Sequence, residues 1–306
     1  MDAQTIVKLF IPFTIGVIMV AMGLGLTVAD FKRVLAHPKA VLIGSINQLI
    51  VLPVVGFAVA FLFGLSAEFA VGLVLITACP GGPSSNLYSN LARGDTALSV
   101  TLTAVSGVAT IVTIPLVTAL ALDVFMGADN DISMPVGDTM LRIVLVVGVP
   151  LAVGMLIRAK WTARALKAEP IVKGVAALLL GVLIVGAIMK RKEDVAANFA
   201  VLGVPVLLLS LSTIAIGAFS GLAFKLPKPQ AITIGIEVGM QNAALAIGLA
   251  LTSLGSEDIA FPAVIYGILA YFTCAVPLVI GRRMLPPPST AEHAAAVSTG
   301  IRRPDG

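Results

Sequence analysis

One acidic residue in a long apolar segment is the first candidate for chemistry. Glu237 lies in the sequence IEVGMQN (236–242), and no other charged residue occurs between Gln230 and Ser256. An acid at the centre of a membrane helix costs about 2.5–3.5 kcal/mol on the insertion scale, so it usually faces a cavity, an ion or a partner. No basic residue lies at the centre of another apolar segment. A bound cation or a proton is therefore the expected partner of Glu237.

A cluster of helix-breaking residues is the second candidate. Residues 79–86 read CPGGPSSN, and two prolines and two glycines in eight residues cannot continue a regular α-helix. The apolar flanks 69–78 and 87–91 are each too short to span a membrane, which favours one interrupted helix over a loop between two helices. The half-helix that follows a break presents a partial positive charge to an anion. Released carbonyls and the Glu237 carboxylate suit a hard cation.

Three further polar side chains lie in apolar segments. Ser99 and Thr103 are four residues apart and share one face of a predicted helix. Both hydroxyls would face the break if that helix packs against it, although Ser and Thr also bond to the carbonyls of their own helix. Gln48 is as compatible with a hydrogen bond between helices as with a ligand role.

These residues must be positioned by helices in a membrane. The chain of 306 residues is 58% hydrophobic and 12% charged, whereas a soluble domain is about 25% charged, and its mean hydropathy is +1.05. A span needs about 20 apolar residues. The apolar runs predict an all-α polytopic membrane protein of about nine transmembrane helices, at 6–29, 39–64, 67–92, 96–121, 139–158, 171–189, 200–224, 229–253 and 259–281.

The basic residues predict the orientation of these helices. Fifteen of them would share one side: Lys32, Arg33, Lys39, Arg93, Arg158, Lys160, Arg164, Lys167, Lys173, Lys225, Lys228, Arg282, Arg283, Arg302 and Arg303. Five would lie on the other: Lys8, Arg142, Lys190, Arg191 and Lys192. Because basic residues are enriched in cytoplasmic loops, we expect a multi-pass protein of the inner (plasma) membrane. Its N-terminus would be outside and its C-terminus in the cytoplasm, with residues 285–306 as a disordered cytoplasmic tail.

The two interrupted helices also predict an internal repeat. They are five helices apart in order, so a repeat that relates them would be inverted, and paired broken helices of this kind indicate the binding site of a transporter. We expect two discontinuous helices that cross near the membrane midplane, broken around Gly81–Ser84 and Val238–Gln241. The histidines and cysteines lack partners at metal-ligand spacing, so no transition-metal site is expected.

These motifs resemble those of a known family. The segment 80–86 (PGGPSSN) with 91–99 (LARGDTALS), and EVGMQN (237–242) late in the chain, are similar to the signature of the bile acid:sodium symporter family. The resemblance covers about residues 6–284, as a single transmembrane transporter domain (1–284). It implies two inverted repeats and two domains. The core domain would contain helices at about 39–121 and 200–281, and the panel domain helices at about 6–29 and 139–189.

The resemblance also implies two sodium sites and a substrate site. Residues that match the first sodium site are Ser85, Asn86, Ser99, Thr103 and Glu237. Those that match the second are Gln48, Glu237, Val238, Met240 and Gln241, with Val238 and Met240 binding through backbone carbonyls. Pro83, Ser84 and Asn242 match the place where a small organic anion binds.

Two departures from the family lie near the expected substrate. Residues 265–271 read IYGILAY where relatives have a Trp-His-Asn stretch, and Pro83 replaces a small polar residue. We therefore expect a smaller metabolite anion, such as a pantoate-like or keto-acid compound, at least as much as a bile acid.

The functional prediction is a sodium-coupled symporter that takes up an organic anion. One alternative is a proton-coupled transporter or exchanger of related fold, in which Glu237 binds a proton. Another is a transporter-like membrane sensor. An enzyme would need a nucleophile and base or a metal-ligand cluster at membrane depth, and the sequence has none. The lipid bilayer and the substrate are the expected partners, without nucleic acid or an obligate protein partner.

Overall fold

The computed structural model describes residues 3–127, 141, 143–190 and 192–285, and all regular secondary structure in these residues is helical. In chain order the helices are α1 (Ala3–Leu24), α2 (Val28–Lys32), α3 (Pro38–Ile46), α4 (Leu52–Leu62), α5 (Ala67–Ala78), α6 (Pro83–Leu91), α7 (Thr96–Met126), α9 (Val149–Lys160), α10 (Thr162–Lys190), α11 (Lys192–Ala223), α12 (Lys228–Gly239), α13 (Ala243–Thr252), α14 (Glu257–Thr273) and α15 (Ala275–Met284). A 3-10 turn, η1 (Arg33–Leu35), follows α2, and π-helical turns η2 (Asn47–Val51) and η3 (Val144–Gly148) precede α4 and α9.

The distribution of side chains is that of a membrane protein. Large apolar side chains lie on the outside, and Leu62, Phe219 and Phe272 are 71–72% exposed. Buried positions hold polar groups such as Thr77 and Glu237. Four described helical segments are long and apolar enough to cross a membrane, or five if the pair α1–α2, bent by 68°, counts as one span. The chain is therefore an all-helical polytopic membrane protein, and the count of nine spans stays a prediction.

Two pairs of short helices are interrupted, and the interruptions meet. Residues 79–82 separate α5 from α6, and residues 240–242 separate α12 from α13. Gly81 and Gln241 form an isolated antiparallel bridge, and the Asn242 amide donates to the Pro80 carbonyl (2.9 Å). The two interrupted helices therefore cross at their breaks, as the sequence predicts.

The breaks lie one or two residues away from their predicted positions. The first begins at Cys79 and ends before Pro83, because a proline with its fixed φ and absent N–H suits the first residue of a helix. Pro83 and Ser84 thus belong to the first turn of α6, not to the break. The second starts later than predicted, because α12 continues through Val238 and Gly239 and the backbone becomes extended at Met240.

The turns that flank the two interrupted helices share their backbone conformation. Before the first and second interrupted helix, Gly64 and Lys225 have φ of 55° and 57°. After them, Arg93 and Gly255 have φ of 59° and 65°. The residue after Gly64 and the residue after Lys225 each donate to a carbonyl five residues back (3.2 and 2.9 Å), which is a Schellman type of helix end. The turns before the two interrupted helices are therefore of the same type. The turns after them share the positive φ but differ in their hydrogen bonds, because the residue after Arg93 bonds five residues back and the residue after Gly255 bonds six residues back.

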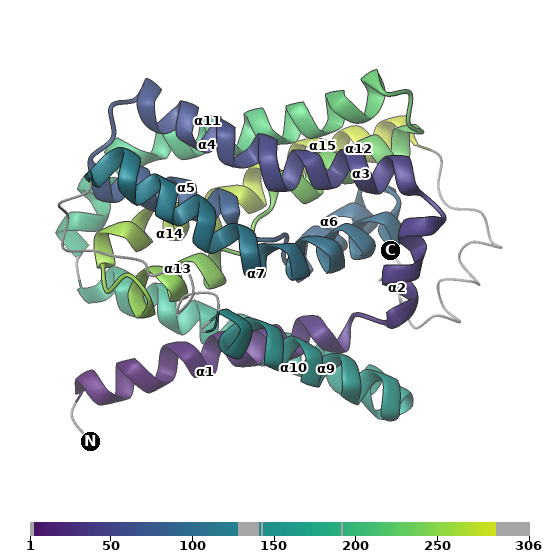
Figure 1. Ribbon diagram of the computed structural model, residues 1–306, viewed down its shortest axis with the longest axis horizontal. Helices are drawn as coiled ribbons and strands as arrows, with labels where there is room; N and C mark the ends of the chain where they lie inside the picture. Colours follow the sequence, from purple (N-terminus) through teal and green to yellow (C-terminus); the bar gives the residue numbers. More distant parts are fainter. Residues whose placement is uncertain (1–2, 128–140, 142, 191, 286–306) are drawn as a thin grey trace.

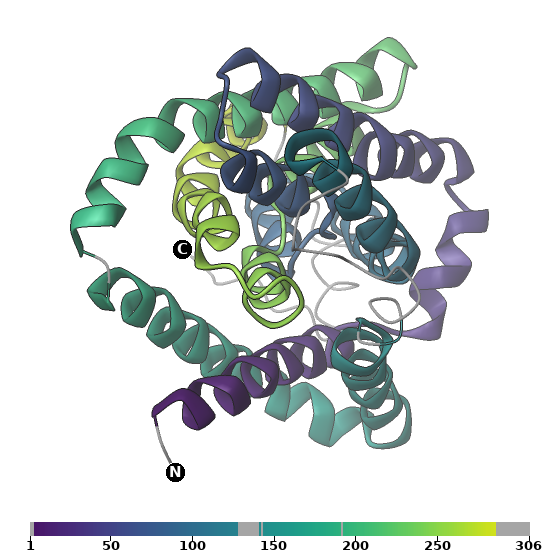
Figure 2. The same cartoon turned by 60° about the vertical axis from the view of Figure 1, so that its left-hand side comes forward.

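Helices α1, α9 and α10 lie side by side (Figures 1 and 2). We treat these three helices as one group and the remaining helices as the other. The backbones of α1 and α9 touch where two glycines face each other. A Cβ on Gly23 would lie 2.2 Å from the Leu151 carbonyl oxygen, and one on Gly154 would lie 2.4 Å from that of Val20. Among the other helices, α5 packs on α4, α7 and α14, and α11 packs on α12 and α14.

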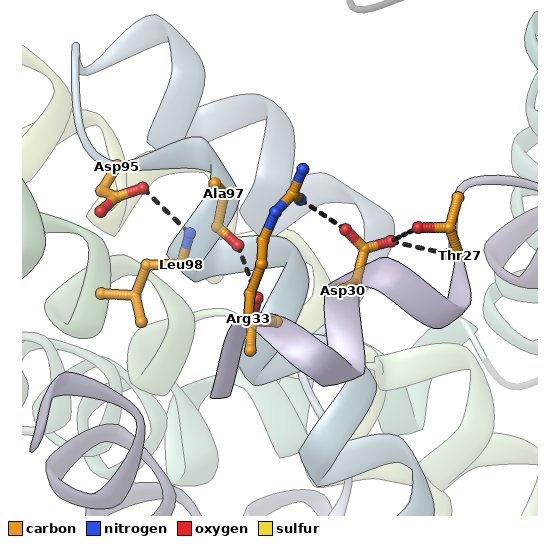
Figure 3. Close-up of polar contacts among 7 residues, drawn as sticks. Thr27, Asp30, Arg33, Asp95, Ala97 and Leu98 are labelled. Atoms are coloured by element: carbon orange, nitrogen blue, oxygen red, sulfur yellow. Dashed lines mark hydrogen bonds and ion pairs between the residues drawn. The ribbon is translucent and has the colours of Figure 1, made fainter. Parts of the chain in front are cut away.

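A short connection leads from α1 to α3 (Figure 3). The buried Asp30 carboxylate accepts hydrogen bonds from the Thr27 amide and hydroxyl, both at 2.7 Å, and pairs with Arg33 at 2.5 Å. The helix that carries Asp30 packs on α7, whose first turn is capped by Asp95 through the Leu98 amide (3.0 Å). The chain therefore leaves the group of α1, α9 and α10 through a turn that the hydrogen bonds and the ion pair of Asp30 stabilise.

Several predicted boundaries differ from those observed. Helix α10 begins at Thr162 rather than at 171, so Arg164 and Lys167 lie inside a helix rather than in the preceding loop. Helix α11 begins at Lys192 rather than at 200. The apolarity criterion missed these starts because both helices open with a charged turn. The predicted tail from 286 onward lies outside the described residues.

Candidate functional site

Glu237 lies in the last turn of α12 and is 1% exposed. Helix α7 brings Ser99 and Thr103 against it. The Ser99 hydroxyl lies 2.9 Å from Glu237 Oε2, and the Thr103 hydroxyl hydrogen-bonds to Oε1. Asn86 of α6 completes this group, because its Oδ1 lies 2.7 Å from the Ser99 hydroxyl and 3.3 Å from that of Thr103. We call these four residues the carboxylate cluster.

Two hydroxyl hydrogens in the carboxylate cluster face three acceptor oxygens, Asn86 Oδ1 and the two carboxylate oxygens of Glu237. Each hydroxyl carries one hydrogen, yet each lies within hydrogen-bonding distance of both Asn86 Oδ1 and a carboxylate oxygen of Glu237. Neither of the two ion pairs found among the described residues involves Glu237. A group of converging oxygen atoms with a negative charge and too few hydrogens suits a hard cation.

The first break lies directly against the carboxylate cluster. An ideal Cβ on Gly81 would lie 2.3 Å from Glu237 Oε1 and 3.4 Å from the Ser85 hydroxyl oxygen. Only glycine permits this approach of the backbone to the carboxylate. Ser85 is buried, but its hydroxyl donates to the Gly82 carbonyl (2.7 Å). The Glu237 carboxylate also interacts with the Ser85 side chain, so Ser85 lies directly beside the four residues of the cluster.

Two glutamines, Gln48 and Gln241, connect the break between α5 and α6 with the break between α12 and α13. The Gln48 side chain, from η2, donates to the Cys79 carbonyl (3.0 Å) and to the Gln241 side chain (2.7 Å). Gln241 donates in turn to the Val238 carbonyl (2.8 Å) and lies 3.4 Å from that of Glu237. We call Gln48, Gln241 and these carbonyls the amide cluster. It gathers carbonyls that the helix ends release.

Among the described residues, Met240 takes no part in the hydrogen bonds of the amide cluster. It is buried in the second break and lines a cavity next to it. The released carbonyl of Gly239 accepts instead from the fully buried Tyr266 hydroxyl (2.9 Å). The carbonyls of Glu237 and Val238 therefore lie near the glutamines, while that of Gly239 is occupied.

A cavity of about 510 Å³ lies beside the two breaks. Its lining comes from both groups of helices: Ile18, Ala21, Gly82, Ser84, Leu87, Lys173, Gly174, Ala176, Met240, Gln241, Asn242, Ala243, Ala244, Gly267, Ala270 and Tyr271. Its size is within the range of small-molecule sites, about 300–1,000 Å³. Most of these lining residues are apolar or small, so few polar groups are available to orient a ligand.

The predicted substrate residues Ser84 and Asn242 both line this cavity. The Ser84 hydroxyl hydrogen-bonds to that of Tyr271 (3.1 Å). The side-chain oxygen of Asn242 caps α13 by accepting from the Leu245 amide (3.1 Å), while its buried Nδ2 has no partner among the described residues. Pro83 begins α6, next to the lining residues Gly82 and Ser84.

Sequence reasoning missed Lys173, which lines the same cavity from α10. The sequence analysis used Lys173 only as one of the basic residues that predict the orientation of the helices. A signal was present, because Glu169 and Lys173 have the i, i+4 spacing of a helical ion pair, and the structure pairs them at 2.7 Å.

Comparison with known proteins gives a consistent result. Residues 12–198 match the model of the sodium bile acid symporter family. The chain is 33% identical over 258 residues to a rice (Oryza sativa subsp. japonica) protein named probable sodium/metabolite cotransporter BASS2, chloroplastic, covering 83% of this chain and 59% of the rice protein. It is 33% identical over 270 residues to the uncharacterized sodium-dependent transporter YocS of Bacillus subtilis, covering 86% of this chain and 80% of that protein. The human P3 protein is 30% identical over 227 residues, 73% of this chain and 46% of that protein.

The chain thus spans 59% of the rice relative and most of the Bacillus one. The names of both relatives describe transporters, in agreement with the sequence-based expectation of a transporter rather than an enzyme.

Proposed function

The chain belongs to the sodium bile acid symporter family, and from that premise we propose that it is a sodium-coupled symporter that takes up a small organic anion by alternating access. The observation that carries the proposal is the carboxylate cluster, with its excess of oxygen acceptors around a buried Glu237 at the crossing of two interrupted helices. Discontinuous helices that supply released carbonyls are typical sodium sites of secondary transporters.

Two sodium ions are proposed, one at each cluster. The first would bind Ser85, Asn86, Ser99, Thr103 and Glu237. The second would bind Gln48, Gln241 and the carbonyls near the end of α12, with Met240 contributing its carbonyl after a local adjustment. Burial of net charge is unfavourable. Glu237 neutralises one sodium ion and a monoanionic substrate neutralises the other, so two sodium ions per monoanion leave the site uncharged.

The substrate is proposed to bind in the cavity beside the breaks, next to Pro83, Ser84 and Asn242. The unpaired Nδ2 of Asn242 supplies a donor for a carboxylate, and α13 begins at this residue, so its N-terminal dipole also favours an anion. The cavity of about 510 Å³ suits a metabolite-sized acid.

The proposed architecture is nine spans in two inverted repeats, with a core and a panel domain. The matching turns at Gly64 and Lys225, and the positive φ shared by Arg93 and Gly255, support the repeat. The panel would consist of α1, α9 and α10, and the remaining long helices would form the core. We place the protein in the plasma membrane, N-terminus outside, on the distribution of basic residues.

A sodium-binding experiment on Glu237 tests this function. We expect Glu237→Gln to lose most of the sodium-dependent thermal stabilisation of the purified protein, because the site loses the charge that balances the cation. Glu68→Gln, in the first turn of α5, is the matched control and should behave as the wild type. Equal sodium midpoints in the two variants would refute the assignment.

The proton-coupled alternative is separated by uptake into proteoliposomes. Sodium symport requires that uptake of a bound anion stops when choline replaces sodium at constant pH. Uptake that persists in choline and follows an imposed pH gradient would establish proton coupling instead.

A further inference from the structure

Helix α10 forms one wall of the cavity and brings a cation to it. Lys173 lines the cavity together with Gly174 and Ala176 of the same helix. Among the lining residues that the structure describes, Lys173 has the one charged side chain. A single cation in a mostly apolar cavity is the kind of group that orients a charged ligand.

Lys173 is paired, but the pair leaves it free to exchange. Its ammonium donates to Glu169 Oε1 (2.7 Å) within α10, and the two side chains are 41% and 19% exposed. The ammonium has three donors, of which Glu169 takes one. Ion pairs of this exposed, intrahelical type contribute little to stability, so an incoming carboxylate can displace Glu169 at small cost.

A second donor lies in the wall that the breaks form. Asn242 is 6% exposed, and its Nδ2 has no hydrogen-bond partner among the described residues. Asn242 lies at the start of α13, whereas Lys173 belongs to the group of α1, α9 and α10. An anion in the cavity would be held by one donor from each group.

We infer that Lys173 binds the carboxylate of the substrate in exchange for Glu169. The inference rests on the proposed function and adds a substrate-binding residue to it. On binding, the Lys173 ammonium would exchange its hydrogen bond to Glu169 Oε1 for one to the substrate carboxylate.

The test measures the affinity of purified protein for monocarboxylates, using pyruvate, 3-methyl-2-oxobutanoate and pantoate as probes. Titration calorimetry in sodium chloride and in choline chloride at equal ionic strength gives the sodium-dependent part. We expect Lys173→Gln to lower the affinity for the tightest-binding probe by about tenfold or more, because one charge-assisted hydrogen bond is lost. Lys173→Arg should largely restore the affinity because it keeps the charge.

Glu169→Gln distinguishes exchange from a structural ion pair. If the ion pair only stabilises α10, Glu169→Gln and Lys173→Gln lower the affinity for the probe by the same factor, and the inference is overturned. If the carboxylate exchanges with Glu169, removal of that competitor tightens binding. Lys167→Gln, exposed on the same helix, is the matched control and should leave the affinity unchanged.

Two further outcomes decide the matter. In the absence of a probe, the sodium midpoint should be the same in wild type and Lys173→Gln, and an equal affinity of these two proteins for the probe would overturn the inference while leaving the symporter function intact. If wild type binds none of the three probes at 10 mM in sodium, the proposed monocarboxylate symport and this inference both fail.

Discussion

The Asn242 side chain uses the two ends of its amide differently. Its oxygen caps α13 by accepting from the Leu245 amide, and its nitrogen is left without a partner at the cavity. A buried donor without a partner is unfavourable by about 1–3 kcal/mol. A ligand that accepts from this nitrogen recovers that free energy, which makes Asn242 a strong candidate for substrate contact.

Because the cap and the donor are separate atoms, they can be tested separately. Asn242→Ser keeps an oxygen suitable for the N-cap and replaces the Nδ2 donor by a shorter hydroxyl. We therefore expect roughly tenfold weaker binding of the carboxylate probe with little change in melting temperature. Asn242→Ala removes both and should also lower the melting temperature.

Thr103→Ala is the comparison for this prediction. It should shift the sodium midpoint measured without substrate, because Thr103 belongs to the carboxylate cluster, and should affect the substrate only through linkage. The distinction fails if Asn242→Ser moves the substrate-free sodium midpoint as far as Thr103→Ala does.

At the scale of elements, the crossing of the interrupted helices depends on close approach of the backbone. Gly81 is bridged to Gln241 and lies against the Glu237 carboxylate. The neighbouring Gly82 differs, because an ideal Cβ on Gly82 meets nothing within 4 Å and its φ of −105° suits any residue. The two glycines therefore have different structural requirements.

We expect Gly81→Ala to displace the carboxylate and weaken sodium binding by about tenfold or more, because overpacking of this kind typically costs about 1–3 kcal/mol. Gly82→Ala should keep the wild-type sodium midpoint. The measurement is the sodium dependence of thermal stability in both variants. An unchanged midpoint in Gly81→Ala would contradict the close contact that the structure describes.

At the scale of the whole molecule, the proposed alternating access requires that α1, α9 and α10 move relative to the other helices. Contact between the two groups occurs where α13 meets α1. There, an ideal Cβ on Gly248 lies 2.8 Å from Cγ1 of Ile15. Cysteines at these positions would therefore be close enough for a disulfide, whose Cβ atoms are about 3.5–4.5 Å apart.

The double variant Ile15→Cys, Gly248→Cys should form this cross-link on oxidation and lose uptake. Reduction should restore uptake, because the cross-link only prevents the relative movement. Each single variant, treated with the same oxidant, controls for oxidation of the buried Cys79 and Cys274. Full uptake by cross-linked protein would show that the two groups do not move apart at this contact during transport.

Local chemistry in the sequence determined the membrane class, the two interruptions and the isolated acid. These follow from residues that act on their own segment. Proline and glycine end a helix wherever they occur, and a buried acid needs compensation in any apolar segment. The sequence also located the hydroxyls of Ser99 and Thr103, but only the family resemblance connected them to Glu237.

The tertiary structure decided which residues far apart in the sequence contact each other. Glu237 meets Ser99 and Thr103 from 138 and 134 residues away, and Gln48 meets Gln241 from 193 residues away. In a membrane protein, a helix face is apolar whether it contacts lipid or another helix, so hydrophobic periodicity does not reveal such pairings. The position of Lys173 in the cavity wall, the division of labour within Asn242 and the contact of Gly81 with the carboxylate depend on these long-range contacts, and only the folded chain specifies them.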